Sequence, residues 1–418
     1  MIALLLAMAG AQEVQGFAEL RATAAIGADG PPFQLVERFR PTFEAPLSER
    51  VFLSTTVEMG FIQGRDNTDV FESALRESDF GPLLEAANCE WPDNANNVFR
   101  IDRASDYLAV DRLYVDWYTP KFDLRVGRQA LQWGSALFIN PTDPFPQVLF
   151  TEPFKPRAGV NSARVTIPFG QLNQVQAVIG TNDTFTKVRA AVRGTVNAAN
   201  TDFSVVSAYR QESDEVLVGM DIKGTLGIGF WLEGGVAFRG LTEETLDVYE
   251  TVAIGADYSF PVLQSLIVSG QYIRNGAEPS GASALTAIQP PECDIPTPFD
   301  ATDTEPDPFA PFLSGQDYGL LAVATGVTRD LGANVVWLQN FGDGSAIFVP
   351  SASIQLPKGF DVSLTAQIPV SSWGDGGEFH PSDDDLTLNV PVGDASIPID
   401  LTGLVPDASV FVWSRYNF

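Results

Sequence analysis

Apolar and polar residues alternate with a period of two along most of this chain. In residues 360–370 every even-numbered position is apolar, whereas Asp361, Ser363 and Thr365 lie between them. Successive side chains of a β-strand point to opposite faces, so this spacing predicts a strand with one apolar and one polar face. Such strands suit a wall that has lipid on one side and water on the other.

Eighteen segments show this pattern or a close variant of it. They are residues 14–24, 33–44, 49–62, 104–118, 121–131, 157–168, 172–181, 185–194, 201–211, 214–223, 226–239, 246–259, 262–274, 316–328, 331–342, 345–356, 359–371 and 406–418. The pattern predicts an all-β fold, a transmembrane antiparallel up-and-down β-barrel of about 18 strands. The alternation is weakest in 33–44 and 331–342, and a barrel of about 16 strands would follow if these two did not form.

The predicted connections fall into a short class and a long class. The short ones are rich in turn residues and lie at 46–48, 119–120, 168–170, 224–227, 260–261, 330–332 and 357–359. The long class includes 63–103, 275–315 and 372–405. Outer-membrane barrels have short periplasmic turns and long extracellular loops, so we expect one barrel over residues 12–418 with both termini at the periplasmic end.

Both ends of the sequence carry features of an exported membrane protein. An alternating segment closes the chain with Tyr416 and Phe418 on one face, which resembles the insertion signal of bacterial outer-membrane barrels. This resemblance implies a place in the bacterial outer membrane, contact with its lipid, and recognition by the barrel-assembly machinery. Residues 1–11 form a short apolar run ending in small residues, which predicts a signal peptide although no Lys or Arg precedes the run.

Charge and residue usage narrow the classes of function. The net charge of -28 argues against nucleic-acid binding, which needs a basic surface. The acidic residues show no calcium-loop spacing, so no metal site or cofactor is expected. The sole histidine, His380, lies in a predicted loop, and no Gly-x-Ser-x-Gly or His-Glu-x-x-His motif occurs, so we expect no enzyme activity.

Several basic residues share the polar phase of their strands. In 185–194 the residues Lys187, Arg189 and Arg193 lie opposite an apolar face. The same test assigns further lumen-facing positions to Arg112, Tyr114, Arg125 and Arg164. A charge on the lipid face costs about 2–4 kcal/mol at mid-depth, so these side chains are expected to line the pore. Acidic residues share the inward phase at Glu19, Asp116, Glu233, Asp257 and Asp361.

Two interpretations of this basic wall remain open. It forms a track for anionic solutes, or it pairs with acidic residues to hold an inner loop. A barrel of about 18 strands is too wide for wall side chains to fill, so it leaves an aqueous channel unless loops fold inward. The candidate for such a loop is the proline-rich, aromatic segment 132–156.

A motif at the start of this segment resembles that of a known group of proteins. Its residues are Gly127, Arg128, Gln129, Trp133, Gly134, Asn140, Pro141 and Asp143. They resemble a motif of large proteobacterial outer-membrane barrels of the porin-like and alginate-export-like types. The alginate-export type implies an eighteen-stranded channel with a basic lumen for an acidic polysaccharide, and periplasmic polysaccharide-export components as partners.

The sequence thus favours an outer-membrane channel for hydrophilic, anionic substrates, and the resemblance favours exopolysaccharide export. Two alternatives remain: a general diffusion porin for small solutes, and a closed structural or adhesive barrel.

Cys89 and Cys293 lie in two long predicted loops of a protein expected in an oxidising compartment. Neither belongs to a Cys-x-x-Cys motif, which argues against redox catalysis and zinc binding. We predict that they form a disulfide between the loops 63–103 and 275–315. Mass spectrometry of unreduced peptides should find the crosslinked pair, and two free thiols in protein isolated from cells would refute it.

Overall fold

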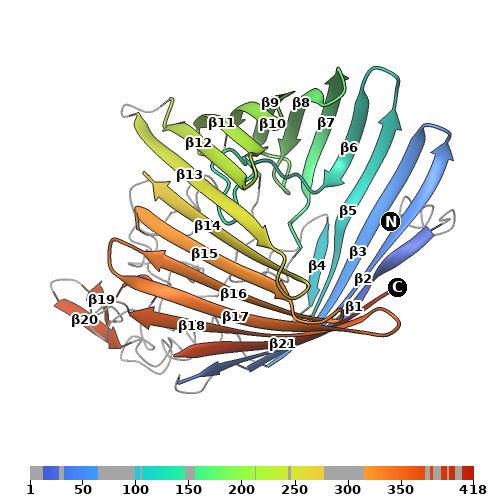
Figure 1. Ribbon diagram of the computed structural model, residues 1–418. Helices are drawn as coiled ribbons and strands as arrows, with labels where there is room; N and C mark the ends of the chain where they lie inside the picture. The colour runs from blue at the N-terminus through green and yellow to red at the C-terminus, as the bar shows by residue number, and fades with distance from the viewer. Residues whose placement is uncertain are drawn as a thin grey trace.

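The computed structural model of this chain is a ring of antiparallel strands around a central lumen (Figure 1). It describes residues 13–27, 33–64, 99–103, 106–145, 156–211, 213–242, 246–276, 315–371, 377–379, 387–392, 395–400 and 407–418. Among these residues no helix is long and apolar enough to cross a membrane.

Eighteen strands form the closed barrel. They are β1 (Glu13–Ile26), β2 (Phe33–Ser48), β3 (Val51–Gly64), β5 (Asp106–Tyr118), β6 (Asp123–Gln129), β7 (Val160–Phe169), β8 (Asn173–Thr181), β9 (Val188–Ala198), β10 (Thr201–Arg210), β11 (Glu215–Thr225), β12 (Gly229–Arg239), β13 (Asp247–Phe260), β14 (Ser265–Asn275), β15 (Asp317–Gly326), β16 (Leu331–Asn340), β17 (Ser345–Leu356), β18 (Phe360–Ser371) and β21 (Ala408–Asn417). The short strand β4 (Arg100–Arg103) pairs with the start of β5, and β19 (Thr387–Val392) pairs with β20 (Ala395–Asp400) as a separate hairpin.

The predicted strand number is confirmed, and the alternative of 16 strands is wrong. The two weak segments form β2 and β16, each paired on both sides. Two predicted turns shift, because β2 continues through 46–48 to a turn at 49–50 and β7 continues through Phe169. In both cases a proline lies inside a strand, where the sequence suggested a turn.

The ring closes where the two ends of the chain meet. β1 pairs with β21 from Phe17 opposite Asn417 to Ile26 opposite Ala408, and β21 also pairs with β18. Closure satisfies the backbone donors and acceptors that an open sheet edge would leave exposed to lipid. The short turns that the sequence predicted and both described ends of the chain lie at one end of the barrel, whereas the opposite end carries the other connections, of which 341–344 is also short.

The outer face of the barrel is an apolar belt. On β10 the outward Val205 is 65% exposed, whereas its inward neighbour Val206 is fully buried. Exposed aromatic side chains gather where strands approach the short turns, at Phe52, Trp117, Tyr118, Phe169, Phe260, Phe360, Tyr416 and Phe418. An apolar belt with an aromatic border is the surface of an outer-membrane barrel, which places this chain in the outer membrane.

Charged side chains of alternating sign link the inner face across the closure. Glu19 on β1 accepts hydrogen bonds from Arg415 on β21, at 2.5 and 3.0 Å, and lies 3.9 Å from Arg38 on β2. Arg38 and Arg40 both approach Glu58 on β3. These pairs satisfy inward charges that the lipid face could not accept.

The last residue contributes directly to closure. The Phe418 N–H donates to the Gly16 carbonyl at 3.0 Å, the Gly16 N–H donates to the Phe418 carbonyl at 2.8 Å, and the Phe418 ring stacks on Phe39 with centroids 5.5 Å apart. Each bond is worth about 1 kcal/mol and the stacking about as much again.

We therefore predict that deleting Phe418 lowers the amount of heat-modifiable barrel in the membrane and its unfolding temperature. Phe418→Tyr, which keeps the ring and both main-chain bonds, serves as the control and should assemble normally. Undiminished membrane insertion and stability after the deletion would count against this role.

Candidate functional site

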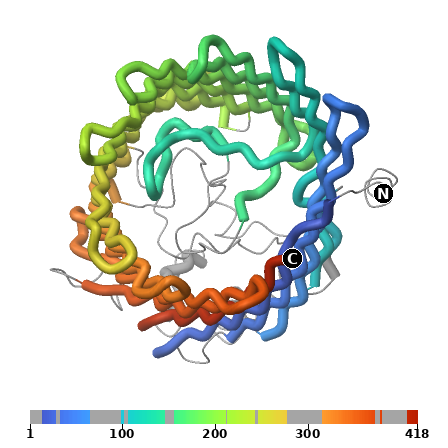
Figure 2. The backbone as a smooth tube through the Cα atoms, turned by 45° about the vertical axis from the view of Figure 1, so that its right-hand side comes forward, coloured from blue at the N-terminus to red at the C-terminus, as the bar shows by residue number. Residues whose placement is uncertain are grey.

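The interior of the barrel is narrowed by residues 130–145, which we call the lumen segment. It follows β6 and lies inside the ring of strands (Figure 2). The prediction that 132–156 folds inward is confirmed for the part that the structure describes, since 146–155 lie outside the described residues. Its side chains Leu131, Trp133, Ile139 and Phe145 are each at most 4% exposed, so the segment is packed and not a solvated loop tip.

The inner wall is apolar where the lumen segment rests on it. Trp133 and Phe145 contact each other edge to face, with centroids 5.1 Å apart, and belong to a buried cluster with inward side chains of β7 to β13. Ile139 belongs to a second cluster with β13 to β17, which includes Ile273 and Leu338. These inward positions would face water in an empty barrel, so the segment removes their apolar surface from water.

Polar side chains of the wall bind both main-chain and side-chain groups of the lumen segment. Gln271 on β14 accepts a hydrogen bond from the Leu137 N–H at 2.8 Å and another from the Trp231 indole at 2.8 Å. Gln176 on β8 accepts from the Trp133 indole at 3.0 Å. The buried carboxylate of Glu233 on β12 also accepts from the segment.

An arginine joins the two ends of the lumen segment. Arg157, just before β7, donates to the Asp143 carboxylate at 2.6 Å and to the Leu131 carbonyl at 2.9 Å. Asp143 is almost completely buried, and this burial raises its pKa to about 7, although the Arg157 guanidinium acts in the opposite direction. Arg112 on β5 donates in turn to the Arg157 carbonyl, which ties this connection to the wall.

One patch on β5, β6 and β7 contains three of the predicted pore-lining residues, Tyr114, Arg125 and Arg164. Arg125 donates two hydrogen bonds to Asp116, at 2.6 and 2.9 Å, and lies over the Tyr114 ring at 4.1 Å. Arg164 lies opposite Arg125 in the register of β6 and β7. Arg164 is half-buried and makes no hydrogen bond or ion pair with any residue in the described part of the chain. This patch therefore offers a guanidinium to the lumen.

Two other predicted residues are engaged with the wall or the lumen segment. Arg193 on β9 donates to Asp221 at 2.9 Å, and Asp221 accepts from the Ser135 hydroxyl of the segment. Arg112 binds Asp111 at 2.5 Å as well as the Arg157 carbonyl. For Arg112 and Arg193 the observed contacts are thus those of the second interpretation, in which arginine pairs with acid to hold an inner loop.

Lys187 differs from its predicted placement. Strand β9 begins at Val188, and Lys187 lies exposed in the turn after β8. The Asn182 side chain accepts from the Thr186 and Lys187 N–H groups, which keeps these residues in the turn. Lys187 therefore does not share the inward face of the strand.

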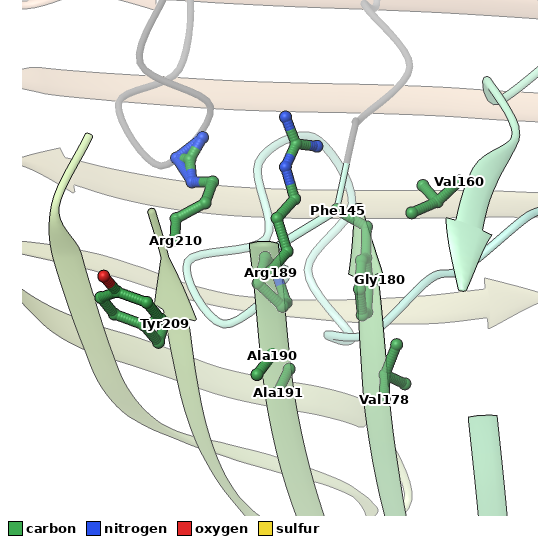
Figure 3. A pocket seen from close by; sticks show the side chains of 10 residues that line it. Phe145, Val160, Val178, Gly180, Arg189, Ala190, Ala191, Tyr209 and Arg210 are labelled. Carbon is green, nitrogen blue, oxygen red and sulfur yellow. The ribbon is translucent and has the colours of Figure 1, made fainter. Parts of the chain in front are cut away.

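Arg189 lies beside a second arginine that the sequence analysis did not identify, Arg210 on β10. The two are direct neighbours in the register of β9 and β10, and their guanidinium groups point the same way (Figure 3). They line a small pocket together with Phe145, the last residue of the lumen segment, and apolar wall residues such as Val178. Arg210 lies 3.6 Å from the buried Glu215, so part of this positive charge is compensated.

The predicted sequence motif spans the start of the lumen segment. Gly127, Arg128 and Gln129 end β6, where the Gln129 amide donates to the Ser162 carbonyl at 3.2 Å and Arg128 pairs with Asp183. Its other members lie inside the lumen segment: Trp133, Gly134, Asn140, Pro141 and Asp143. The motif therefore encodes how the chain leaves the wall and turns inward.

Three further residues that the sequence singled out lie outside the part of the chain that the structure describes. Cys89, Cys293 and His380 lie outside the described residues, so the predicted disulfide stays a prediction. Within the described ranges no group of three His, Cys, Asp or Glu side chains is placed to hold a metal ion.

Comparisons with known proteins identify the fold. No protein family and no curated protein matches the sequence. Among solved structures, OccAB3 of Acinetobacter baumannii is 10% identical with a TM-score of 0.56, over 97% of this chain and 99% of that one. OprD of Pseudomonas aeruginosa is 10% identical with a TM-score of 0.53, over 98% and 94% of the two chains. OccK2 (OpdF) of Pseudomonas aeruginosa, in complex with glucuronate, is 9% identical with a TM-score of 0.50, over 98% and 99%.

These similarities support a porin-type barrel and leave the expected alginate-export type unsupported. At such low identity they define the fold alone. The chain thus has the eighteen-stranded barrel fold seen in the OprD and Occ outer-membrane porins.

The raised pKa of Asp143 generates a prediction on stability. Between 3.8, its ordinary value, and about 7, the folded protein keeps a proton that the unfolded chain has lost, so this group lowers the free energy of unfolding as pH rises through that range. The Asp143→Asn variant cannot ionise at this position. Its unfolding temperature should therefore rise relative to that of the native chain as the pH increases from 3.8 to about 7. Heat-modifiability midpoints across the range measure this difference, and a constant difference would mean that Asp143 stays ionised throughout.

Proposed function

We propose that this protein is an outer-membrane diffusion channel for small hydrophilic solutes. The observation that carries the proposal is the lumen segment, which is packed inside a closed eighteen-stranded barrel. A barrel of this width encloses an aqueous lumen, and an inward loop limits the size of what crosses it. Transport by diffusion needs no catalytic group, which agrees with the channels that share this fold.

Diffusion of small solutes fits these observations better than export of a polymer. The solved structures named above are porins, and one of them was determined with glucuronate, a small sugar acid. The lumen segment also lies in the lumen through which a polymer chain would have to pass. We therefore favour a diffusion porin over an exporter of polysaccharide.

Selectivity for anions is the second part of the proposal. Arg164 and Arg125 lie side by side on the inner wall, and of these two only Arg125 forms an ion pair with a carboxylate, that of Asp116, among the described residues. Acidic residues on exposed loops are screened over about 8–10 Å by salt, whereas charge inside a low-dielectric channel is focused on the permeating ion. The patch of Arg125 and Arg164 can thus favour anions locally although the whole chain is acidic.

Planar-bilayer recording and liposome swelling of the refolded protein test the channel. We expect stepwise conductance and uptake of small neutral sugars, with a sharp fall as the solute size increases. A correctly folded barrel that neither conducts nor admits small sugars would instead favour the closed structural or adhesive barrel.

Arg164→Glu tests the anionic preference. Reversing a lumen charge that has no salt-bridge partner in the described residues should raise the cation-to-anion permeability ratio by about twofold or more. Reversal potentials in a salt gradient measure the change. Lys187→Glu, in an exposed turn, reverses the same charge outside the lumen wall and should leave the ratio nearly unchanged. Equal ratios for all three proteins would mean that the β5–β7 patch does not contact the permeating ions.

A further inference from the structure

We infer that Glu233 sets the aperture of the channel by holding the bend of the lumen segment against the wall. This inference rests on the proposed channel function and identifies the residue that positions its narrowing. Glu233 lies on β12 and is fully buried, and no part of the sequence pattern distinguishes it from the other inward acidic residues.

Among the described residues, the Glu233 carboxylate accepts four hydrogen bonds, all from the lumen segment. One oxygen, Oε2, accepts the N–H groups of Ser135 and Ala136 at 2.8 and 3.0 Å. The other oxygen, Oε1, accepts the N–H and the hydroxyl of Thr142, both at 2.8 Å. The two oxygens thus hold the two arms of one bend, residues 135–136 and residue 142.

These donors are the main compensation for a buried negative charge. No Lys or Arg of the described residues forms an ion pair with Glu233. A buried carboxylate without hydrogen bonds is costly, and so are buried N–H groups without acceptors. The carboxylate and the bend therefore stabilise each other. By comparison, the polar wall residues Gln176, Asp221 and Gln271 each accept one hydrogen bond from the described residues of the segment.

The backbone of the lumen segment at Gly134 lies close to the Glu233 carboxylate. Gly134 adopts a φ of +84°, a conformation that side chains disfavour. A Cβ at this position would lie 2.5 Å from Glu233 Oε1 and 2.5 Å from Asn140 Oδ1. A side chain at residue 134 would therefore displace the Glu233 carboxylate, the Asn140 amide or the bend itself, and each of these shifts disturbs the contact between Glu233 and the bend.

Glu233→Gln is the sharpest single test because it preserves the shape of the side chain. An amide keeps one acceptor oxygen, but its NH₂ group would face the N–H donors that one carboxylate oxygen now binds. About half of the bonds to the bend are lost, and Glu233→Ala loses all of them. Gly134→Ala disturbs the same contact from the lumen segment and leaves the sequence of the wall unchanged.

Matched controls separate the bend from general effects of substitution. Glu37→Gln makes the same chemical change at an exposed position of β2, whose neighbour in the register, Leu20, is exposed on the outer face. Gly194→Ala adds a Cβ on β9 that meets nothing within 4 Å. Both control variants should conduct like the native chain.

The measurement is single-channel conductance together with the size limit in liposome swelling. We expect Glu233→Gln, Glu233→Ala and Gly134→Ala to raise unit conductance by about half or more, to admit larger sugars, and to increase current fluctuations, because a freed bend no longer fixes the narrowest section. A purely structural role would lower the yield and unfolding temperature of the barrel and leave unit conductance unchanged, and that result would overturn the inference.

Hydrogen exchange of peptides covering 130–145 keeps the two proposals distinguishable. The amides of Ser135, Ala136 and Thr142 should exchange faster in the Glu233 and Gly134 variants than in either control. If exchange is faster in these variants but the native barrel does not conduct, the channel function is rejected, while the role of Glu233 in positioning the bend is supported. A conducting native barrel whose variants show neither faster exchange nor altered conductance would reject the role of Glu233.

Discussion

The absence of water in the membrane core is the constraint on which this structure depends. Each backbone N–H and C=O there needs a partner within the protein, and a sheet meets this need only when its first and last strands pair. The pairing of β1 with β21 therefore fixes the diameter of the ring, and with it the width of the lumen. Everything inside the barrel, including the lumen segment, adapts to a space that backbone hydrogen bonding has already set.

Inward side chains then serve two purposes on different parts of the same wall. From β7 to β17 many are apolar and support the lumen segment, whereas on β21, β1, β2 and β3 they are charged and compensate one another. Burial gives the polar contacts of the segment their importance, since a lost acceptor inside a packed interior costs more than one at a solvated surface. A narrowing that is built in this way has a defined position.

The sequence predicts the wall well and the contents of the lumen poorly. A period of two identifies all eighteen strands and the inward phase of Arg112, Arg125 and Arg164, because the lipid excludes charge from the other phase. The pattern weakens in β16, where Leu338 faces inward against the lumen segment while Val335 faces outward, so that both faces are apolar.

Strand periodicity also cannot show which inward carboxylate meets which donor, and for this reason Glu233 resembles Asp361 in sequence although their surroundings differ. The prediction that Lys187 faces the lumen is wrong because the Lys187 N–H donates to the Asn182 side chain in the turn, and β9 begins only at Val188. Alternation of residue types does not show where such a turn ends.

Closure of the ring also gives the strands a cyclic order, in which no pair of neighbours is special once the barrel has formed. The join of β1 to β21 has the same antiparallel pairing as the hairpin of β9 and β10, whose two turn residues Ala199 and Asn200 both have positive φ. A circular permutant that links the native ends and opens the chain at this turn would contain the same contacts in the folded state. It would lack the aromatic residue at the end of its last strand. Comparing its refolding in detergent with its insertion in cells would separate what the terminal strand contributes to stability from what it contributes to recognition during assembly.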